Sequence, residues 1–392
     1  MNPPANYPVA VFGPYHPHRG GIAHHTTLLA QTLAQDHPVL GLGFTRLYPG
    51  FLFPGRTQKD ESGAPLVPQG VEVQHLVDCL GPHTWLAAVS ALRRFRTKLL
   101  VVQWWHPFFA PACAVIARGA RRSGARVVYL CHNVLPHERS ALDVVLVKMG
   151  LAAADGFLVQ NRNDVAVLNH LFPGRPCEWT PHPAYTFFAR GAVDRAAARQ
   201  VLGVDGPVVL FFGLVRPYKG LDVLLRALAV ARRTVPITLL VAGEFYQDRA
   251  PYDELVRSLG LTDAVRIHDH YIPNEAVERY FRAADLVVLP YVAATQSGIA
   301  QIALSFERPV VVTRVGGLPE VIREGETGYV VPPSDPQALG ACLAAFFADS
   351  TAARMAPHLR GEAARFSWAA MGGAVHRVGA ALGLPTPSET NA

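Results

Sequence analysis

The sequence predicts an α/β protein with two doubly wound parallel-sheet domains that face each other across a cleft. Short apolar segments alternate with glycine-containing turns and helical patterns through both halves of the 392-residue chain. That length exceeds one ordinary core, and half of the residues are hydrophobic, so two cores can be filled. Because such sheets bind ligands at the carboxyl ends of their strands, two facing sheets predict a site between the domains.

The composition excludes several classes of protein. No apolar run has the length needed to cross a bilayer, and the first residues lack the basic and apolar segments of a signal peptide. We therefore expect an uncleaved cytoplasmic protein that can reach the inner membrane surface. The five cysteines are odd in number and scattered, which predicts neither a disulfide framework nor a zinc site.

The net charge of +6 fits anionic partners but does not choose among nucleotide, acidic lipid and nucleic acid. No nucleic-acid-binding module is visible, so we expect no nucleic-acid partner. Basic residues cluster twice in the first half and fit either a solvated helix face or a patch that docks on an anionic membrane or on an acceptor. The clusters are Arg93, Arg94, Arg96 and Lys98, and Arg118, Arg121, Arg122 and Arg126.

The first βα unit contains a strand over residues 9–12, a loop that ends at Gly20-Gly21, and a helix over about 22–34. The loop does not have the GxGxxG spacing, which disfavours a nicotinamide cofactor. Gly20 and Gly21 fit either a ligand-contacting turn at the carboxyl edge of the sheet or a plain tight turn.

Three further strands are predicted in the first half, over residues 99–103, 127–131 and 156–160. Aromatic residues follow the first of them, and Trp105 fits either the core or a pocket for a sugar or apolar acceptor. Polar residues follow the second strand at the edge where ligands bind, which favours a role in a site. These acceptor-side candidates are His132, Asn133, His137 and Glu138.

The βα pattern stops at a proline-rich and aromatic segment and then begins again. Neither helical nor strand periodicity runs through residues 175–188, so we place the domain boundary there. The expected parts are an N-terminal domain (1–180), a linker (181–206), a C-terminal domain (207–365) and a C-terminal helix (366–392).

The second array carries the features expected of a phosphate site. A strand over residues 207–212 leads into a loop with Arg216 and Lys219 beside a helix start, where the two cations can hold a diphosphate or can be solvated. After a later strand, Ser297 and Gly298 open a helix whose free N–H groups attract anions. Glu244, Thr295 and Gln296 are further polar candidates at strand ends.

In order and spacing, these motifs resemble those of retaining glycosyltransferases of the GT-B fold, with two Rossmann-like domains, close to glycosyltransferase family 4. The resemblance covers nearly the whole chain. The motifs in the first half are Gly20-Gly21, His132-Asn133, Pro136-His137-Glu138 and 154–160. Those in the second half are Gly213, Arg216, Lys219-Gly220, Ala242-Gly243, 284–290, 309–311, Gly316-Gly317-Leu318-Pro319-Glu320, Gly325, Gly328 and Phe366-Ser367-Trp368.

The resemblance implies transfer of a sugar from a nucleotide-sugar donor to a hydroxyl of a saccharide or lipid-linked acceptor, with retained anomeric configuration. It implies no metal and no cofactor, since the nucleotide-sugar is a substrate. Arg216, Lys219, Gly20-Gly21 and the amides of Ser297 and Gly298 bind the diphosphate in this interpretation. Glu244, Thr295 or Gln296 contacts the donor sugar or nucleotide, and His132 acts at the reacting sugar.

The sequence departs from the family at one place. The family commonly carries two glutamates eight positions apart in the segment before 309–311, and the corresponding residues here are Ala294 and Ile302. The segment instead resembles a variant branch with Thr-Gln-Ser-Gly. Two alternatives to a transferase therefore stay open: a non-catalytic homologue that acts as a binding partner, and an epimerase or glycan phosphorylase of the same fold.

Overall fold

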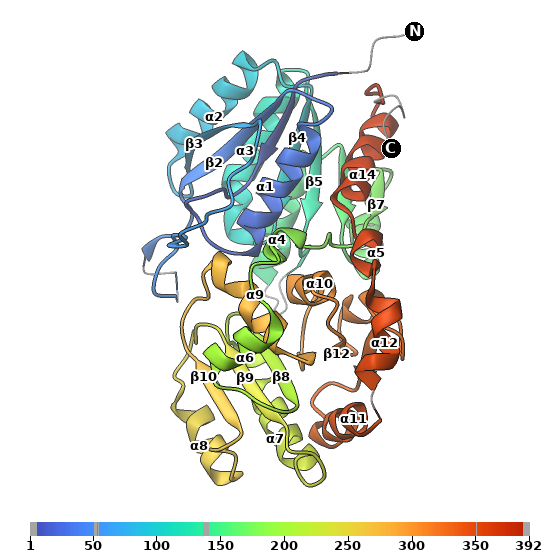
Figure 1. Cartoon of the computed structure of the whole chain (residues 1–392). Helices are drawn as coiled ribbons and strands as arrows, with labels where there is room; N and C mark the ends of the chain where they lie inside the picture. The colour runs from blue at the N-terminus through green and yellow to red at the C-terminus, as the bar shows by residue number, and fades with distance from the viewer. Residues whose placement is uncertain (1–5, 51–52, 54, 136–140, 350, 387–392) are drawn as a thin grey trace. The chain divides into compact units, whose positions relative to one another are not determined.

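The computed structural model describes residues 6–50, 53, 55–135, 141–349 and 351–386. These residues form two compact units (Figure 1). Unit 1 holds the chain up to Asp60, Pro65–Pro181 and the segment from Trp368 onward; unit 2 holds Glu61–Ala64 and His182–Ser367.

Unit 1 is built on a seven-stranded parallel sheet with the order β3-β2-β1-β4-β5-β6-β7. The four strands predicted from the sequence are present, and β2, β3 and β7 were not predicted. The strands are β1 (Val9–Phe12), β2 (Val39–Arg46), β3 (Glu72–Asp78), β4 (Leu99–Trp104), β5 (Arg126–Cys131), β6 (Gly156–Val159) and β7 (Cys177–Trp179).

Within the described residues, six α-helices accompany this sheet, and the last comes from near the end of the chain. They are α1 (Gly21–Leu33), α2 (Pro82–Arg94), α3 (Ala110–Arg122), α4 (Ala141–Leu151), α5 (Arg162–Leu171) and α14 (Trp368–Ala381). Helix α14 packs on α1 and on β5, β6 and β7, and its Met371 and Val375 are fully buried. Helix α14 is therefore part of the apolar core of unit 1.

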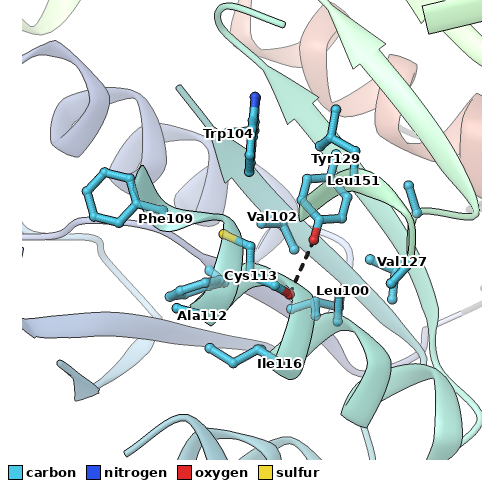
Figure 2. Close-up of a cluster of buried hydrophobic side chains, with 14 of the residues drawn as sticks. Leu100, Val102, Trp104, Phe109, Ala112, Cys113, Ile116, Val127, Tyr129 and Leu151 are labelled. Carbon is cyan, nitrogen blue, oxygen red and sulfur yellow. Dashed lines mark hydrogen bonds between the residues drawn. The ribbon is translucent and has the colours of Figure 1, made fainter. Parts of the chain in front are cut away.

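The apolar core on the other face of the sheet lies between the central strands and α3 (Figure 2). Leu100 and Val127 of these strands and Ile116 of the helix belong to this cluster. The buried Tyr129 hydroxyl lies 2.8 Å from the carbonyl oxygen of Gly150 and 3.3 Å from that of Cys113, so its polar atom is satisfied.

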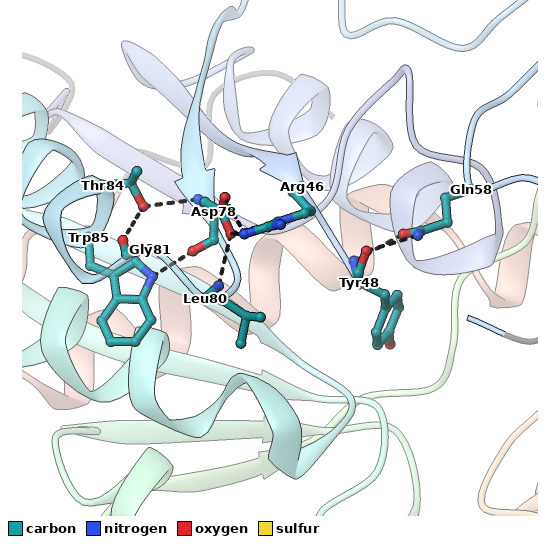
Figure 3. Close-up of polar contacts among 8 residues, drawn as sticks. All are labelled: Arg46, Tyr48, Gln58, Asp78, Leu80, Gly81, Thr84 and Trp85. Atoms are coloured by element: carbon teal, nitrogen blue, oxygen red, sulfur yellow. Dashed lines mark hydrogen bonds and ion pairs between the residues drawn. The ribbon is translucent and has the colours of Figure 1, made fainter. Parts of the chain in front are cut away.

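Polar contacts stabilise the β2–β3 edge and the long segment that joins these strands (Figure 3). Arg46 at the end of β2 pairs with Asp78 at the end of β3, at 2.8 Å. The carboxamide of Gln58 donates to the carbonyl of Tyr48 at 2.9 Å and accepts from its N–H at 3.0 Å. These bonds replace regular pairing in residues 47–70, whose described part contains no α-helix or named strand.

Unit 2 contains a six-stranded parallel sheet with the order β10-β9-β8-β11-β12-β13. The strand predicted over residues 207–212 is present as β8. The strands are β8 (Val208–Phe212), β9 (Thr238–Ala242), β10 (Val265–His268), β11 (Leu286–Leu289), β12 (Val310–Thr313) and β13 (Gly328–Val331).

Helices flank these strands in chain order. They are α6 (Arg195–Leu202), α7 (Leu221–Ala231), α8 (Ala250–Ser258), α9 (Asn274–Ala283), α10 (Gly298–Ser305), α11 (Pro336–Ala348), α12 (Thr351–Leu359) and α13 (Glu362–Arg365). Residues 182–206, expected as a linker, contain α6 and cluster with unit 2. Helix α6 packs on α9, and Arg199 pairs with Asp285 at 2.7 Å.

Candidate functional site

The loop after β8 is fixed by two glycines. Gly213 has a φ of 99° and donates its N–H to the carbonyl of Ala242 at 2.8 Å. Gly220, at the start of α7, has a φ of 68°, and a Cβ on it would lie 2.1 Å from the carbonyl oxygen of Pro290. No other residue fits there without a backbone shift, so glycine sets the close approach of this loop to the end of β11.

This approach predicts a large effect of Gly220→Ala on the stability of unit 2. The new methyl group meets a backbone carbonyl, and the left-handed conformation is unfavourable for alanine. We expect the free energy of unfolding to fall by more than about 3 kcal/mol in urea titrations. Gly203→Ala is the matched control, since Gly203 has a φ of 61° with open space around it, and should cost about 1–2 kcal/mol. Equal effects of the two changes would contradict the prediction.

Lys219 is a buried cation beside this loop. Lys219 is 9% exposed. Burial lowers the pKa of its ammonium group, and the positive charge of Arg216 lowers it further by a smaller amount. Its Nζ lies 5.4 Å from the centre of the Tyr291 ring, and the guanidinium carbon of Arg216 lies 4.7 Å from that of Tyr246. Within the described residues neither cation has a carboxylate partner. Two such cations form a site that an anion would stabilise.

The start of α10 faces the same loop. The Ser297 hydroxyl caps this helix by accepting from the N–H of Ile299 at 3.3 Å, and it lies 3.3 Å from the hydroxyl of Tyr291. A Cβ placed on Gly213 would lie 3.3 Å from Lys219 Nζ and 3.4 Å from the side chain of Ile299. The loop glycine therefore brings the lysine and the helix start together, where N–H groups and a positive charge favour a phosphate.

Tyr291 and Tyr185 lie beside the start of α10 in unit 2 but were not predicted from the sequence. Burial raises the pKa of Tyr291 to about 12, so its hydroxyl remains neutral at physiological pH and can donate a hydrogen bond. A Cβ on Gly298 would lie 3.0 Å from the Tyr185 ring and 3.7 Å from Nε2 of His182. Tyr185 lies far from this helix start in the sequence, so no local pattern connects the two.

The sugar-side candidates of unit 2 line adjacent turns. Thr295 is 8% exposed, and its carbonyl accepts from the N–H of Gly317 at 2.8 Å. The Gln296 carboxamide donates to the carbonyl of Gly317 at 3.4 Å, and Glu244, at the end of β9, is 1% exposed. Ile302, at the place of the family's second glutamate, is buried, with 6% of its surface exposed. These residues remain candidates for contact with a donor.

In unit 1, Gly20 and Gly21 open α1. Gly20 has a φ of 109° and accepts from the N–H of His24 at 3.1 Å through its carbonyl. Gly21 is exposed and is the first residue of the helix. The backbone therefore needs glycine at position 20, and the N–H groups of this helix start remain near the surface.

His132 is 7% exposed at the end of β5, and three residues that the sequence analysis missed surround it. Its Nε2 lies 2.6 Å from Oε1 of Gln103, and its Nδ1 lies 3.2 Å from Oε1 of Gln160. The ring centre of His25 lies 4.6 Å from that of His132. Gln103 lies near the end of β4 and Gln160 directly follows β6, so a polar residue at the end of an apolar strand was the available signal.

The other candidates of unit 1 are less closely grouped. Trp105 is half-buried, donates from Nε1 to the hydroxyl of Tyr48 at 2.9 Å and packs on Phe109 with ring centres 4.4 Å apart. Asn133 is half-buried. His137 and Glu138 lie outside the described residues.

The described residues contain neither a metal-site cluster nor a helix suited to cross a membrane. In this part of the chain, no cluster of three or more His, Cys, Asp or Glu side chains has the arrangement of a metal site. None of the described helices combines the length and apolar character that a membrane crossing requires.

Residues 206–349 of this chain match the family described as glycosyl transferases group 1. D-inositol 3-phosphate glycosyltransferase of Streptomyces avermitilis is 30% identical over 273 residues, which is 64% of this chain and 59% of the relative. The enzyme of the same name from Acidothermus cellulolyticus is 28% identical over 305 residues, 74% of this chain and 64% of the relative. Two further Streptomyces relatives are covered over 43% and 39% of their lengths, so the chain spans about half the length of these curated relatives.

Solved structures match over almost the whole chain. Sucrose-phosphate synthase from Thermosynechococcus elongatus has a TM-score of 0.72 at 20% identity, with 96% of this chain and 99% of that chain covered. Anabaena HepE in complex with UDP has a TM-score of 0.73 at 18% identity, with 96% and 100% covered. Residues 206–349 therefore match the group 1 glycosyl transferases, and the chain as a whole has the GT-B fold with two parallel-sheet Rossmann-like domains.

Proposed function

We propose that the chain is a retaining glycosyltransferase that moves a sugar from a nucleotide-sugar donor to a hydroxyl of a saccharide or lipid-linked acceptor. The observation that carries the proposal is the meeting of Lys219, the Gly213 turn and the start of α10 within unit 2. Relatives named as glycosyltransferases and the UDP-glucose complex of HepE support a nucleotide-sugar donor.

The proposed chemistry uses positive charge at the leaving group. The bond between the anomeric carbon and the distal phosphate oxygen breaks, and its electron pair stays on the nucleoside diphosphate. Lys219, Arg216 and the N–H groups that begin α10 stabilise this charge, and a buried site strengthens each interaction. The acceptor hydroxyl oxygen forms the new bond to the anomeric carbon, and its proton passes to the departing diphosphate. No metal ion has a role in this proposal.

A thermal-shift screen tests the donor. A ligand that binds only the folded protein raises its melting temperature, by an amount that grows with ligand concentration over the dissociation constant. We expect one nucleoside diphosphate among UDP, GDP and ADP to raise the melting temperature, and its sugar conjugate to be hydrolysed or transferred with retention when analysed by NMR. No shift with any of the three would contradict the donor site.

The two alternatives differ from transfer in their products. A non-catalytic homologue, suggested by Ala294 and Ile302, binds the nucleotide without product. An epimerase isomerises the donor without an acceptor, and a phosphorylase releases a sugar phosphate from a glycan. Product analysis with and without an added saccharide separates these outcomes.

We further propose that unit 1 contacts an anionic membrane. The two basic clusters are exposed at the ends of α2 and α3 and the starts of β4 and β5, and Arg93 donates to the hydroxyl of Ser123 at 3.0 Å. This edge of the sheet is opposite to the edge that carries His132.

Flotation with vesicles tests this contact. The protein should float with vesicles that contain phosphatidylserine at low salt, and binding should weaken at 0.5 M salt as charges are screened. Exchange of Arg93, Arg94, Arg118 and Arg122 for Glu should abolish flotation, whereas the same exchange at the exposed Arg226 and Arg257 of unit 2 should not. Absence of flotation at low salt would contradict the contact.

A further inference from the structure

Four buried polar side chains form a continuous chain in unit 1 that the proposed chemistry does not use in full. His25 comes from α1, Gln103 from β4, His132 follows β5 and Gln160 follows β6. Each is at most 7% exposed. Nε2 of His25 lies 2.9 Å from Nε2 of Gln160, whose Oε1 lies 3.2 Å from Nδ1 of His132. Nε2 of His132 lies 2.6 Å from Oε1 of Gln103.

The number of available N–H groups limits which ring nitrogens in this chain of side chains can carry protons. A neutral imidazole has one N–H and one bare nitrogen, whereas an imidazolium has two N–H groups. With carboxamide oxygens at both ring nitrogens, His132 must donate twice and is therefore an imidazolium. In that arrangement the NH₂ group of Gln160 donates to His25, so the bare nitrogen of His25 is Nε2.

A half-turn of one carboxamide makes every ring neutral. If Gln160 turns, His25 donates from Nε2 to its oxygen, its NH₂ group donates to Nδ1 of His132, and Nε2 of His132 donates to Gln103. If Gln103 turns instead, its NH₂ group donates to Nε2 of His132, Nδ1 of His132 donates to Gln160, and Gln160 donates to Nε2 of His25. In each of these two arrangements, all hydrogen bonds donate in the same direction along the chain of side chains. Burial favours these neutral arrangements over the one with a charged imidazolium.

The two neutral chains share one property. In the first, both histidines carry their proton on Nε2; in the second, both carry it on Nδ1. We propose that Gln160 locks His25 and His132 into the same tautomer whenever both are neutral, and that His25, Gln160 and Gln103 are positioning residues for His132. The positioning role rests on the proposed transfer function, in which His132 acts at the reacting sugar, but the lock itself follows from the hydrogen-bond geometry.

Neighbouring groups fit this assignment. The ring centre of His25 lies 5.0 Å from that of Trp368 at the start of α14, which fixes the plane of the His25 ring. Burial lowers the pKa of the adjacent His24 to about 4, so His24 is neutral at physiological pH. Helix α1 therefore places two titratable groups at this hydrogen-bond chain, His24 and His25. Helix α14 contributes the indole of Trp368, which does not titrate.

Nitrogen-15 NMR of histidine-labelled full-length protein tests the lock without any activity measurement, because bare and protonated ring nitrogens have separate shifts. In the wild type at pH 7.5 we expect His25 and His132 to be the same tautomer. If His132 is doubly protonated, His25 must carry its proton on Nδ1. Opposite neutral tautomers, or a doubly protonated His132 beside an Nε2-protonated His25, would overturn the proposal.

Gln160→Glu provides the matched change. A carboxylate only accepts, so His25 should donate to it from Nε2 and His132 from Nδ1, which makes the two tautomers opposite or charges His132. The acid limb of the kcat profile should move to higher pH, whereas Gln200→Glu, on the exposed face of α6, should change neither readout. The Nε2 atoms of His37 and His376 lie 3.1 Å apart in unit 1, so the ring signals of this pair report whether the variant is folded. Rings that stay as in the wild type in folded Gln160→Glu would also overturn the lock.

The wild-type spectrum decides the question even if the variant does not fold. An inactive protein that shows matched tautomers separates the two proposals, since the lock then holds and the proposed function fails. Matched tautomers in a protein that transfers sugar support both the lock and the proposed function. In that case Gln160→Glu should lower kcat and leave the KM for the donor unchanged.

Discussion

Replacement of Lys219 by Met should remove most of the affinity for a nucleoside diphosphate while leaving the protein folded. The charge-assisted hydrogen bond that is lost is worth about 1.5–3 kcal/mol, or roughly 10- to 150-fold in the dissociation constant. Transfer should fall further, by about 100- to 1,000-fold in kcat, because the lysine acts on charge that develops as the diphosphate departs. Calorimetric titration and a transfer assay measure the two losses.

The stability of the unliganded variant provides the control for folding. Burial disfavours the charged form of Lys219, and within the described residues no carboxylate offsets this cost. A Met side chain fills similar space without charge, so the melting temperature without ligand should stay the same or rise. Arg226→Met, at an exposed position of α7, should alter neither binding nor stability. Full nucleotide affinity in Lys219→Met would remove this residue from the site.

The elements that the sequence failed to predict are those in which glycine or exposure masks strand periodicity. Strand β2 contains Gly41 and Gly43, which suggest a turn. In the structure, a Cβ on Gly41 would lie 2.9 Å from the Val73 side chain, and one on Gly43 would lie 2.8 Å from that of His75. These glycines permit close packing against β3, a contact that no local pattern contains. Strand β3 lies at the sheet edge and is largely half-exposed, so it lacks the apolar run of a central strand.

The site could be predicted where its residues follow one another and not where they come from distant strands. Lys219 and Ser297 stand beside glycine turns at helix starts, a local signal of anion binding. Gln103 and Gln160 are single polar residues within or after apolar strands, and each meets His132 only through the parallel order β4-β5-β6. His25 lies 135 positions before Gln160 and contacts it from helix α1. Such contacts depend on tertiary packing that periodicity does not encode.

Replacement of His132 by Ala should abolish most transfer while nucleotide binding is retained. The proposed diphosphate contacts of Lys219 and Ser297 belong to unit 2, whereas His132 belongs to unit 1, so calorimetric affinity for the diphosphate should change less than about threefold. Loss of an interaction that acts only on the reacting sugar lowers kcat and kcat/KM together, by about 100-fold or more.

The choice between a role in the reaction and a role in packing can be made with two comparisons. His132→Ala removes one partner of Gln103 and one of Gln160 and leaves two buried carboxamides to rearrange. This alone should lower the free energy of unfolding by about 1–3 kcal/mol. His132→Gln keeps a polar group in the chain, so it should recover part of this stability without recovering transfer. His83→Ala, on the exposed surface of α2, should leave both unchanged. If His132→Gln regained full turnover together with stability, the histidine would be a structural residue and would have no direct role in catalysis.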